Sequence, residues 1–100
     1  MTKRVAKAPA KRISPAEAAG LVRSGMWLDY GVTLSQPDTF DAALAARAAE
    51  LEDVKIRSCL SVKRRAFIEA DPQGKHFHWF NWHFSGYDRL QHDAGRCTYI

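Results

Sequence analysis

The middle of the chain most constrains its fold, because strand, loop, helix and strand patterns follow one another there. Residues 26–32 form a short, mostly apolar run between turn signals, which predicts a buried strand. Residues 54–60 alternate apolar and polar side chains and predict a second strand. Between them, an alanine-rich helical pattern opens at Pro37 or Asp38 and runs to about Leu51. Such a βαβ unit predicts parallel strands joined by a right-handed crossover, and therefore an α/β fold with an open, mostly parallel sheet and flanking helices.

An earlier helix is predicted from its start signal. Ser14 suits the N-cap, Pro15 suits the first helical position, and Glu17 stands where a capping box needs an acidic residue. The helix is expected to run towards a stop at Gly25. Three apolar residues then share one face of it: Ala18, Leu21 and Val22.

The second half of the chain is less regular. Its expected elements are a short helix over 64–70, a turn over 71–74, an aromatic strand over 76–84, a helix over 87–93 that ends near Gly95, and the start of another strand over 97–100. A sheet that stopped at this last strand would leave backbone groups unpaired. We therefore expect the sequence to be an incomplete part of a larger α/β protein.

The positive charge is concentrated at the amino terminus. The chain has 15 basic and 11 acidic residues and a net charge of +4. Residues 1–12 hold five basic residues and no acidic one, so the remainder is close to neutral. We interpret residues 1–12 as a solvated, poorly ordered leader, with contact to nucleic acid or an acidic surface as the alternative. Residues 13–100 are then a partial amino-terminal α/β domain.

Composition also indicates a compartment. No apolar run is long enough to cross a membrane, and no apolar stretch follows the basic leader as it would in a secretory signal. Only two cysteines occur, Cys59 and Cys97, which is typical of reduced thiols rather than a disulfide framework. We expect a cytoplasmic protein that does not associate with membranes.

The loop over 31–37 is the first candidate site. It lies between the carboxyl end of a predicted strand and the amino end of a helix, where α/β sheets bind ligands. Backbone N–H groups there can hold an anion or a developing oxyanion. The loop matches neither phosphate-binding glycine motif, so a plain connection and a ligand site both stay open.

The aromatic run is the second candidate. His76 and His78 share a strand face, as in some metal sites, but His83 has the opposite parity and neither cysteine stands at zinc-ligand spacing. We interpret these residues as core and interface side chains and expect no metal. Base stacking by the aromatic rings is the weaker alternative, since no RNA-binding signature accompanies them, and we expect no nucleic-acid partner.

Two further features have simple interpretations. The basic run 63–65 is expected to be a solvated helix start, with contact to the phosphates of a nucleotide-like ligand as the alternative. Cys59 has no base partner in sequence and is expected to be an inert buried thiol. No serine-hydrolase motif is present.

Three stretches carry a family resemblance: KRISPAEAAGLVRSGMWLDYG, SQPDTFDAALAARAAELEDVKIRSCLS and FNWHFSGYDRLQHDAGRCTYI. Over residues 11–100 the chain resembles the amino-terminal domain of the acetyl-CoA hydrolase/transferase family (CoA-transferase family I). Within that family it looks most like butyryl-CoA:acetate and 4-hydroxybutyrate CoA-transferases. The third stretch is the most specific, with an aromatic strand, a Ser-Gly turn, an arginine and a later glycine.

The resemblance implies a two-domain α/β enzyme that moves CoA between an acyl-CoA and a short-chain carboxylate such as acetate or butyrate. A glutamate of the carboxyl-terminal half attacks the acyl-CoA and carries CoA as a glutamyl thioester. Because the family's glutamate lies in the carboxyl-terminal half, the resemblance does not give that role to Glu17, Glu50, Glu52 or Glu69. No catalytic residue is therefore expected in this chain. CoA is a substrate, and no cofactor is implied. We expect the full-length protein to be a homo-oligomer and this 100-residue chain to be inactive without its carboxyl-terminal domain.

The family's glycine-rich substrate loop maps onto Gly31, Ser35, Gln36 and Pro37, with Ser35 replacing the family's second glycine. A Cβ at that position restricts φ and narrows the approach to the backbone. Ser35 is expected either to re-aim the loop or to offer its hydroxyl to the substrate. Three further matches are expected to be structural: Gly86, Arg89 and Gly95. Two other functions stay open, an acyl-CoA hydrolase and a small non-catalytic α/β binding protein.

Overall fold

The computed structural model describes residues 8–100. Residues 1–7 of the predicted leader lie outside the described residues, while residues 8–12 are exposed and belong to no helix or strand. The elements are α1 (Pro15–Gly20), β1 (Trp27–Val32), α2 (Asp38–Ala45), β2 (Val54–Cys59), α3 (Ala66–Glu69), β3 (Phe77–Asn81), α4 (Gly86–Asp93) and β4 (Thr98–Tyr99), with 3-10 turns η1 (Thr33–Ser35) and η2 (Ala48–Glu50).

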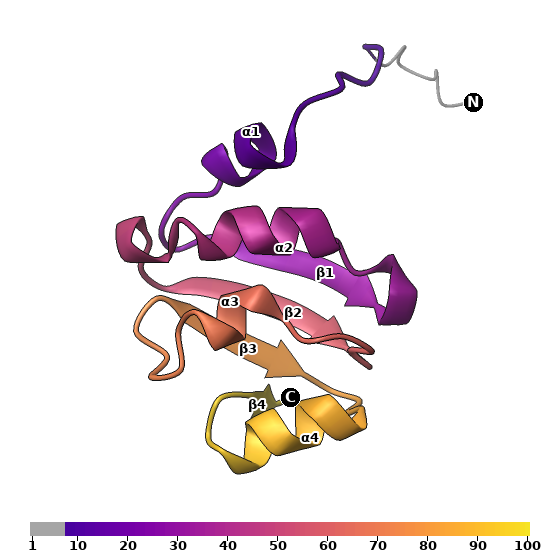
Figure 1. Cartoon of the computed structure of the whole chain (residues 1–100), viewed down its shortest axis with the longest axis vertical. Coiled ribbons are helices and arrows are strands. Elements are labelled where there is room, and N and C mark those ends of the chain that lie inside the picture. The colour runs from indigo at the N-terminus through magenta and orange to yellow at the C-terminus, as the bar shows by residue number, and fades with distance from the viewer. Residues whose placement is uncertain (1–7) are drawn as a thin grey trace, which may run out of the picture.

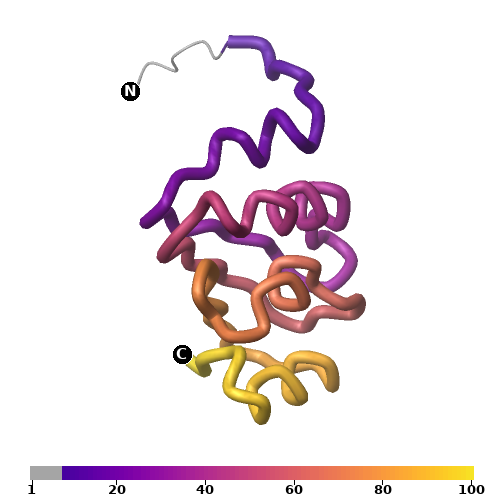
Figure 2. The backbone as a smooth tube through the Cα atoms, turned by 60° about the vertical axis from the view of Figure 1, so that its left-hand side comes forward, coloured from indigo at the N-terminus to yellow at the C-terminus, as the bar shows by residue number. Residues whose placement is uncertain are grey.

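The four strands form one parallel sheet in the order β1-β2-β3-β4. Each crossover contains a helix, and α2, α3 and α4 lie in front of the sheet in Figure 1. Figure 2 shows α1 at one end of the long axis and α4 with β4 at the other. The α/β fold with an open parallel sheet is therefore confirmed. No helix within residues 8–100 is long and apolar enough to cross a membrane.

Aromatic rings fill the space between helices and sheet. The ring of Phe67, on α3, lies 5.4 Å from Tyr30, 5.9 Å from Phe77 and 5.6 Å from Trp79, each in an edge-to-face arrangement. Such pairs stabilise a core beyond the apolar area they bury. Phe67 is fully buried, so this short helix contributes the centre of the core.

A buried carboxylate fixes α3 in place. Asp41 of α2 is 2% exposed, and its two oxygens accept hydrogen bonds from the backbone N–H groups of Ala66 (2.5 Å) and Phe67 (3.2 Å). The same carboxylate accepts the hydroxyl of Tyr30 at 2.9 Å. Asp41 thus caps the amino end of α3 and joins it to β1 and α2. Burial and this carboxylate raise the pKa of the Tyr30 hydroxyl far above its usual value.

The first strand differs from its prediction. Of its residues only Tyr30 is buried, whereas Trp27 is 53% exposed. The difference arises because β1 lies at the edge of the sheet. An apolar run in an edge strand does not imply that both faces of the strand are covered. The second strand agrees with its alternating pattern, with Val54 and Ile56 fully buried.

The first two helices are shorter than predicted. The capping box of Ser14 and Glu17 is confirmed, but α1 ends at Gly20 rather than near Gly25, and Leu21 is 67% exposed. The guanidinium of Arg47 replaces a glycine stop, since it donates to the carbonyl oxygens of Ala19 and Val22. α2 ends at Ala45, and the 3-10 turn that follows places Leu51 in the core at 2% exposure.

Later elements follow their predictions with small changes of bounds, since α3 and β3 are shorter than predicted and α4 begins one residue earlier, at Gly86. The turn 71–74 is closed by a hydrogen bond from the Gly74 N–H to the Asp71 carbonyl. The aromatic strand is confined to Phe77–Asn81, because the chain turns at Trp82. Gly95 follows α4 with φ +79°, the left-handed geometry that glycine adopts readily at a helix end.

Replacing Asp41 by asparagine is expected to destabilise the protein by about 2–4 kcal/mol. The amide NH2 group cannot accept a hydrogen bond, so backbone N–H groups of α3 or the amide's own N–H groups are left without a partner in the core. Urea unfolding followed by circular dichroism measures this. Asp29→Asn is the matched control, since Asp29 pairs with Arg57 at the surface and its loss should leave the midpoint unchanged. Equal effects of the two substitutions would contradict the capping role.

Candidate functional site

The carboxyl ends of β1, β2 and β3 meet at one edge of the sheet, the right-hand side of Figure 1. Each strand is followed there by a loop and the amino end of a helix, with loops over 31–37, 60–65 and 82–85. This is the edge at which parallel α/β sheets bind ligands. We take these three loops as the candidate site and call them the carboxyl-edge loops.

The loop after β1 begins at an irregularity of the strand. The register between β1 and β2 slips between Asp29 and Gly31, and Gly31 has φ +80°. A Cβ built on Gly31 would lie 3.2 Å from the Ser35 hydroxyl oxygen. The left-handed conformation therefore favours glycine at this position, and the Ser35 hydroxyl leaves little space for a Cβ.

Ser35 does not offer a free hydroxyl. Its Oγ donates to the carbonyl oxygen of Val32 at 2.6 Å and accepts the N–H of Val32 at 3.3 Å. The hydroxyl therefore closes the 3-10 turn Thr33–Ser35 onto the strand end. Of the two expectations for Ser35, the structure agrees with a role in shaping the loop.

Gln36 links the loop to the neighbouring strand. Its Nε2 donates to the carbonyl oxygen of Cys59 at 3.0 Å and to that of Gly31 at 3.4 Å. Because both partners are acceptors, the orientation of the amide is fixed and Oε1 is left without a hydrogen bond in a side chain that is 5% exposed. Pro37, half-buried, is the N-cap residue of α2, so the four predicted site residues form one continuous turn.

Two carboxyl-edge loops contain strained backbone. Thr33 has φ +49° and Leu60 has φ +52°, the left-handed region that side chains with a branched or bulky Cβ rarely adopt. They follow the ends of neighbouring strands, β1 and β2. Such strain persists only where surrounding contacts impose it, and it clusters at functional sites. Neither residue was identified from the sequence, because local pattern does not reveal φ.

Buried polar atoms without a partner gather at the same edge. Among residues 8–100, five such side-chain atoms occur: Gln36 Oε1, Ser61 Oγ, Arg65 Nη1, Asn81 Nδ2 and Asp88 Oδ1. Three of these residues lie at a strand end or in the loop that follows it, while Arg65 and Asp88 lie at the amino ends of α3 and α4. Unpaired buried groups cost free energy and call for water or another partner. The carboxyl edge is therefore the polar, incompletely satisfied region of this domain.

The basic run 63–65 is only partly the solvated helix start that its sequence predicts, since Lys63 and Arg64 are exposed but Arg65, the N-cap residue of α3, is buried. Arg65 is 2% exposed, and its Nη2 donates to Asp38 Oδ1 at 2.6 Å, while Lys63 Nζ donates to Asp38 Oδ2 at 2.9 Å. Hydrogen bonds from Arg65 and Lys63 hold the pKa of the Asp38 carboxyl below its usual value. The burial of Arg65 was not predicted, because a local run of charges does not reveal an ion pair between the β2–α3 loop and α2.

Asp88 joins the second and third carboxyl-edge loops. It is fully buried, and its Oδ2 accepts the backbone N–H groups of Ser61 (3.2 Å) and Ser85 (3.1 Å). Its role was not predicted from the sequence, although Ser85 and Asp88 have capping-box spacing and that box is present in α4. Burial, with a smaller effect of the Asp88 carboxylate, raises the pKa of both Cys59 and Cys97, the latter to about 12. Cys59 is thus buried, as predicted.

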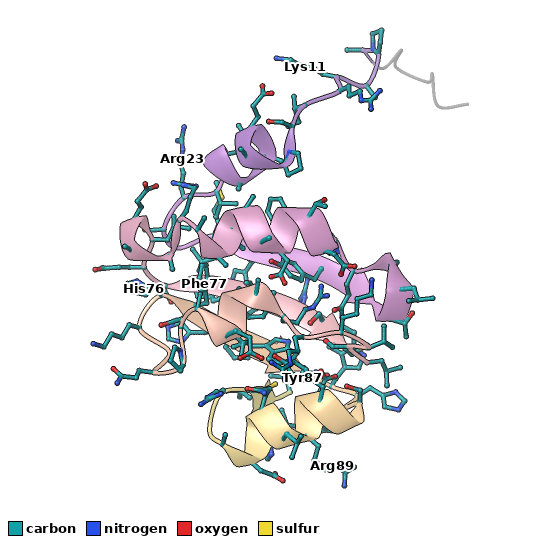
Figure 3. All side chains as sticks on the ribbon, viewed as in Figure 1. Lys11, Arg23, His76, Phe77, Tyr87 and Arg89 are labelled. Atoms are coloured by element: carbon teal, nitrogen blue, oxygen red, sulfur yellow. The ribbon has the colours of Figure 1, made fainter. Side chains whose placement is uncertain are left out.

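The histidines do not converge. His76 precedes β3 at the opposite edge of the sheet, where Figure 3 shows it, and its Nδ1 lies 2.8 Å from the Leu51 carbonyl oxygen. His78 lies 3.7 Å from the Asp53 carboxylate at the surface. Within the described range 8–100, no cluster of three or more potential metal-binding side chains occurs.

Comparison with known proteins assigns the family. The model of the acetyl-CoA hydrolase/transferase N-terminal domain matches residues 1–100. The chain belongs to the acetyl-CoA hydrolase/transferase family. The resemblance drawn from the three sequence stretches is therefore confirmed.

Two relatives within this family are named as CoA-transferases. One is a probable butyrate:acetyl-CoA coenzyme A-transferase of Syntrophomonas wolfei, 46% identical over 79 residues, which are 79% of this chain and 18% of the relative. Another is a butyryl-CoA:acetate CoA-transferase of Anaerostipes caccae, 38% identical over 73% of this chain and 16% of the relative. The chain thus spans less than a fifth of the length of these curated relatives.

A solved structure agrees on the fold. RipA from Yersinia pestis superposes with a TM-score of 0.69 at 17% identity, covering 88% of this chain and 23% of that chain. The identity is low, so this similarity supports the α/β arrangement alone.

The remaining family matches lie on α4 or just after it. Gly86 is the first residue of α4 and Gly95 follows its last turn. Arg89 is exposed and turned away from the body of the protein, whereas Tyr87 on the same helix is turned toward it (Figure 3). The Tyr87 hydroxyl accepts the N–H of Arg65 at 3.2 Å and donates to Glu69 at 3.0 Å.

Gly31→Ala is expected to lower the free energy of unfolding by about 1–2 kcal/mol, because a side chain must then adopt the left-handed conformation. Urea denaturation measures the change. Gly20→Ala is the control, since it has open space around it and no positive φ, and no loss is expected there. A stability of Gly31→Ala equal to that of the control would contradict the required turn.

Both cysteines are expected to resist alkylation in the native protein at pH 8 and to react rapidly in urea. The thiolate is the reactive form, and the raised pKa makes it scarce. The alkylation rate at Cys97 should keep rising as the pH increases from 9.0, the ordinary pKa of this thiol, towards its raised pKa of about 12. A rate that levels off near pH 9 would contradict this. Because the folded state holds the Cys97 proton more tightly, the free energy of unfolding should fall as pH rises through this range.

Proposed function

We propose that this domain supplies one wall of the substrate site of a CoA-transferase, an enzyme that moves CoA from an acyl-CoA to a short-chain carboxylate of the acetate or butyrate type. Family membership supports an enzyme that acts on acyl-CoA. The names of two relatives support transfer rather than hydrolysis. The observation on which the proposal most depends is the carboxyl edge, where strain, unpaired polar atoms and the Gly31–Pro37 turn occur together.

In the proposed reaction a glutamate outside this chain attacks the thioester carbonyl. CoA leaves as a thiolate, the resulting acyl-glutamyl anhydride is opened by that thiolate, and the released acid carries away the acyl group. The incoming carboxylate then takes CoA from the glutamyl thioester by the reverse of these steps. Each step exchanges acyl bonds without oxidation, so the proposal needs no cofactor besides CoA as substrate. We place the reaction in the cytoplasm and in a homo-oligomer.

Within this domain the proposed substrate-binding residues are Gly31, Ser35, Gln36 and Pro37. Gly31 allows the backbone to turn sharply at the strand end, and Ser35 holds that turn closed. Gln36 fixes the turn against β2 and leaves Oε1 as an unused acceptor. Their role is to position the substrate, whereas the bond-making glutamate comes from elsewhere.

The direct test uses the longer protein that carries this domain, with butyryl-CoA and acetate. Formation of acetyl-CoA and butyrate supports transfer, free CoA without acetyl-CoA indicates the hydrolase alternative, and no change of butyryl-CoA contradicts both enzymes. Mass spectrometry of the protein after butyryl-CoA alone should find covalently attached CoA, which acetate removes.

Gln36→Leu is expected to lower kcat/KM about tenfold, or ~1.4 kcal/mol, because it releases the turn from the Cys59 carbonyl. Steady-state kinetics in the longer protein measure this. Gln73→Leu, in the exposed turn at the opposite edge, is the control and should leave kcat/KM unchanged. Equal kinetics for the two variants would exclude Gln36 from the site.

A further inference from the structure

We propose that the open face of the sheet is the docking surface for a helix from the part of the longer protein beyond residue 100, and that this helix is joined to a strand that pairs with the free edge of β1. Both contacts lie within one polypeptide. Neither contact depends on the proposed reaction, so each can be tested without measuring activity.

The sheet has one covered face and one open face. α2, α3 and α4 lie on the covered face (Figure 1), where side chains of β2 and β3 such as Ile56 and Trp79 are buried. Parallel sheets are almost always covered on both faces, so the open face predicts a further layer. The strand register places two rows of side chains on the open face: Trp27, Lys55 and His78 in one row, and Asp29, Arg57 and Phe80 in the next.

The open face has an apolar centre with charges around it. The rings of Trp27 and Phe80 lie 5.1 Å apart between their centroids, across the intervening strand β2. Lys55 Nζ and the Arg57 guanidinium carbon lie 5.7 and 5.8 Å from the centroid of the Trp27 ring. Arg57 also pairs with Asp29 at 2.6 Å. Exposed aromatic rings bordered by paired charges are typical of an interface, and they suit the apolar stripe of an amphipathic helix.

The handedness of the crossovers determines which strand the covering helix accompanies. The connections from β1 to β2, β2 to β3 and β3 to β4 all advance in one direction across the sheet, and their helices lie on the same face. Because such crossovers are right-handed, a further strand beyond β4 would place its helix on the covered face again. A helix on the open face requires a strand order that advances the other way. The new strand must therefore pair with β1.

β1 has a free edge at which such a strand can pair. Among residues 8–100, β1 pairs only with β2. The Met26 carbonyl oxygen accepts the Lys55 N–H at 2.9 Å and therefore points towards β2. Since backbone groups alternate along a strand, the N–H and C=O groups of Trp27 and Asp29 point towards the free edge. An incoming strand would satisfy these backbone groups and end the exposure of the edge.

The lengths of the relatives favour the same polypeptide, rather than a second copy, as the occupant. The matched segments make up 18% and 16% of the two named CoA-transferases, so most of each relative lies outside the matched part. A polypeptide of that length has ample sequence for another helix and strand. A second copy would instead bring two parallel sheets face to face, whereas parallel sheets are covered by helices.

Photo-cross-linking in the longer protein tests the docking surface. His78, exposed on the open face, is replaced by p-benzoylphenylalanine, and cross-linked peptides are mapped by mass spectrometry in a mixture of isotopically labelled and unlabelled copies. Cross-links should join position 78 to residues beyond position 100 of the same copy. The same substitution at Gln73, in the exposed turn 71–74, is the control and should cross-link far less. Cross-links between copies, equal yields at both positions, or none at position 78 would overturn the proposal.

Hydrogen exchange in the unmodified longer protein tests the added strand without any substitution. The Asp29 N–H should exchange roughly 100-fold or more slowly than the Gln73 N–H of the exposed turn, because it is paired in the sheet. Equal exchange rates would show that the edge of β1 stays free and would overturn the proposal. Loss of transferase activity would leave both measurements unaffected, so the proposed function and this docking surface fail separately.

Discussion

The buried carboxylate of Asp41 is the interaction on which this arrangement depends. α3 has only four residues and cannot persist as an isolated helix. It nevertheless contributes Phe67, the ring around which Tyr30, Phe77 and Trp79 pack. Asp41 supplies the partners for the first N–H groups of α3 and thereby places that ring. A polar contact from α2 thus determines where the apolar core forms.

The same device recurs in two other connections. Asp71 is 4% exposed and accepts the N–H groups of Lys75, His76 and Phe77, which brings the chain into β3. Asp88 is fully buried and accepts those of Ser61 and Ser85. Backbone donors that the irregular segments would leave unpaired are satisfied by these carboxylates. Loops at both edges of the sheet are consequently fixed by buried carboxylates, Asp71 at the start of β3 and Asp88 at the carboxyl edge.

The sequence predicted what local chemistry determines. The βαβ order, the Ser14–Glu17 capping box and the glycine at the end of α4 all follow from patterns within a few residues, and each was found. The burial of Arg65 and the role of Asp41 were missed, because they depend on contacts between residues more than 20 positions apart. The exposure of β1 was missed for a related reason, since a strand's place at the sheet edge is a property of the whole topology. For the candidate site, the sequence predicted a loop over 31–37 between a strand and a helix, and the structure has one there, while the hydrogen bonds from Gln36 to Cys59 and from Leu60 to His83 were not predictable.

The serine in the substrate loop shows why this distinction matters for function. A glycine at position 35 would leave the turn free to adjust, whereas the Ser35 hydroxyl bonds both the N–H and the carbonyl of Val32. The Ser35 hydroxyl also approaches the position a Gly31 side chain would occupy, so the two residues depend on each other. A serine at position 35 therefore leaves less space for a side chain at position 31. The turn that results fixes the backbone at the end of β1, so a single departure from the family pattern is coupled to the shape of the proposed substrate loop.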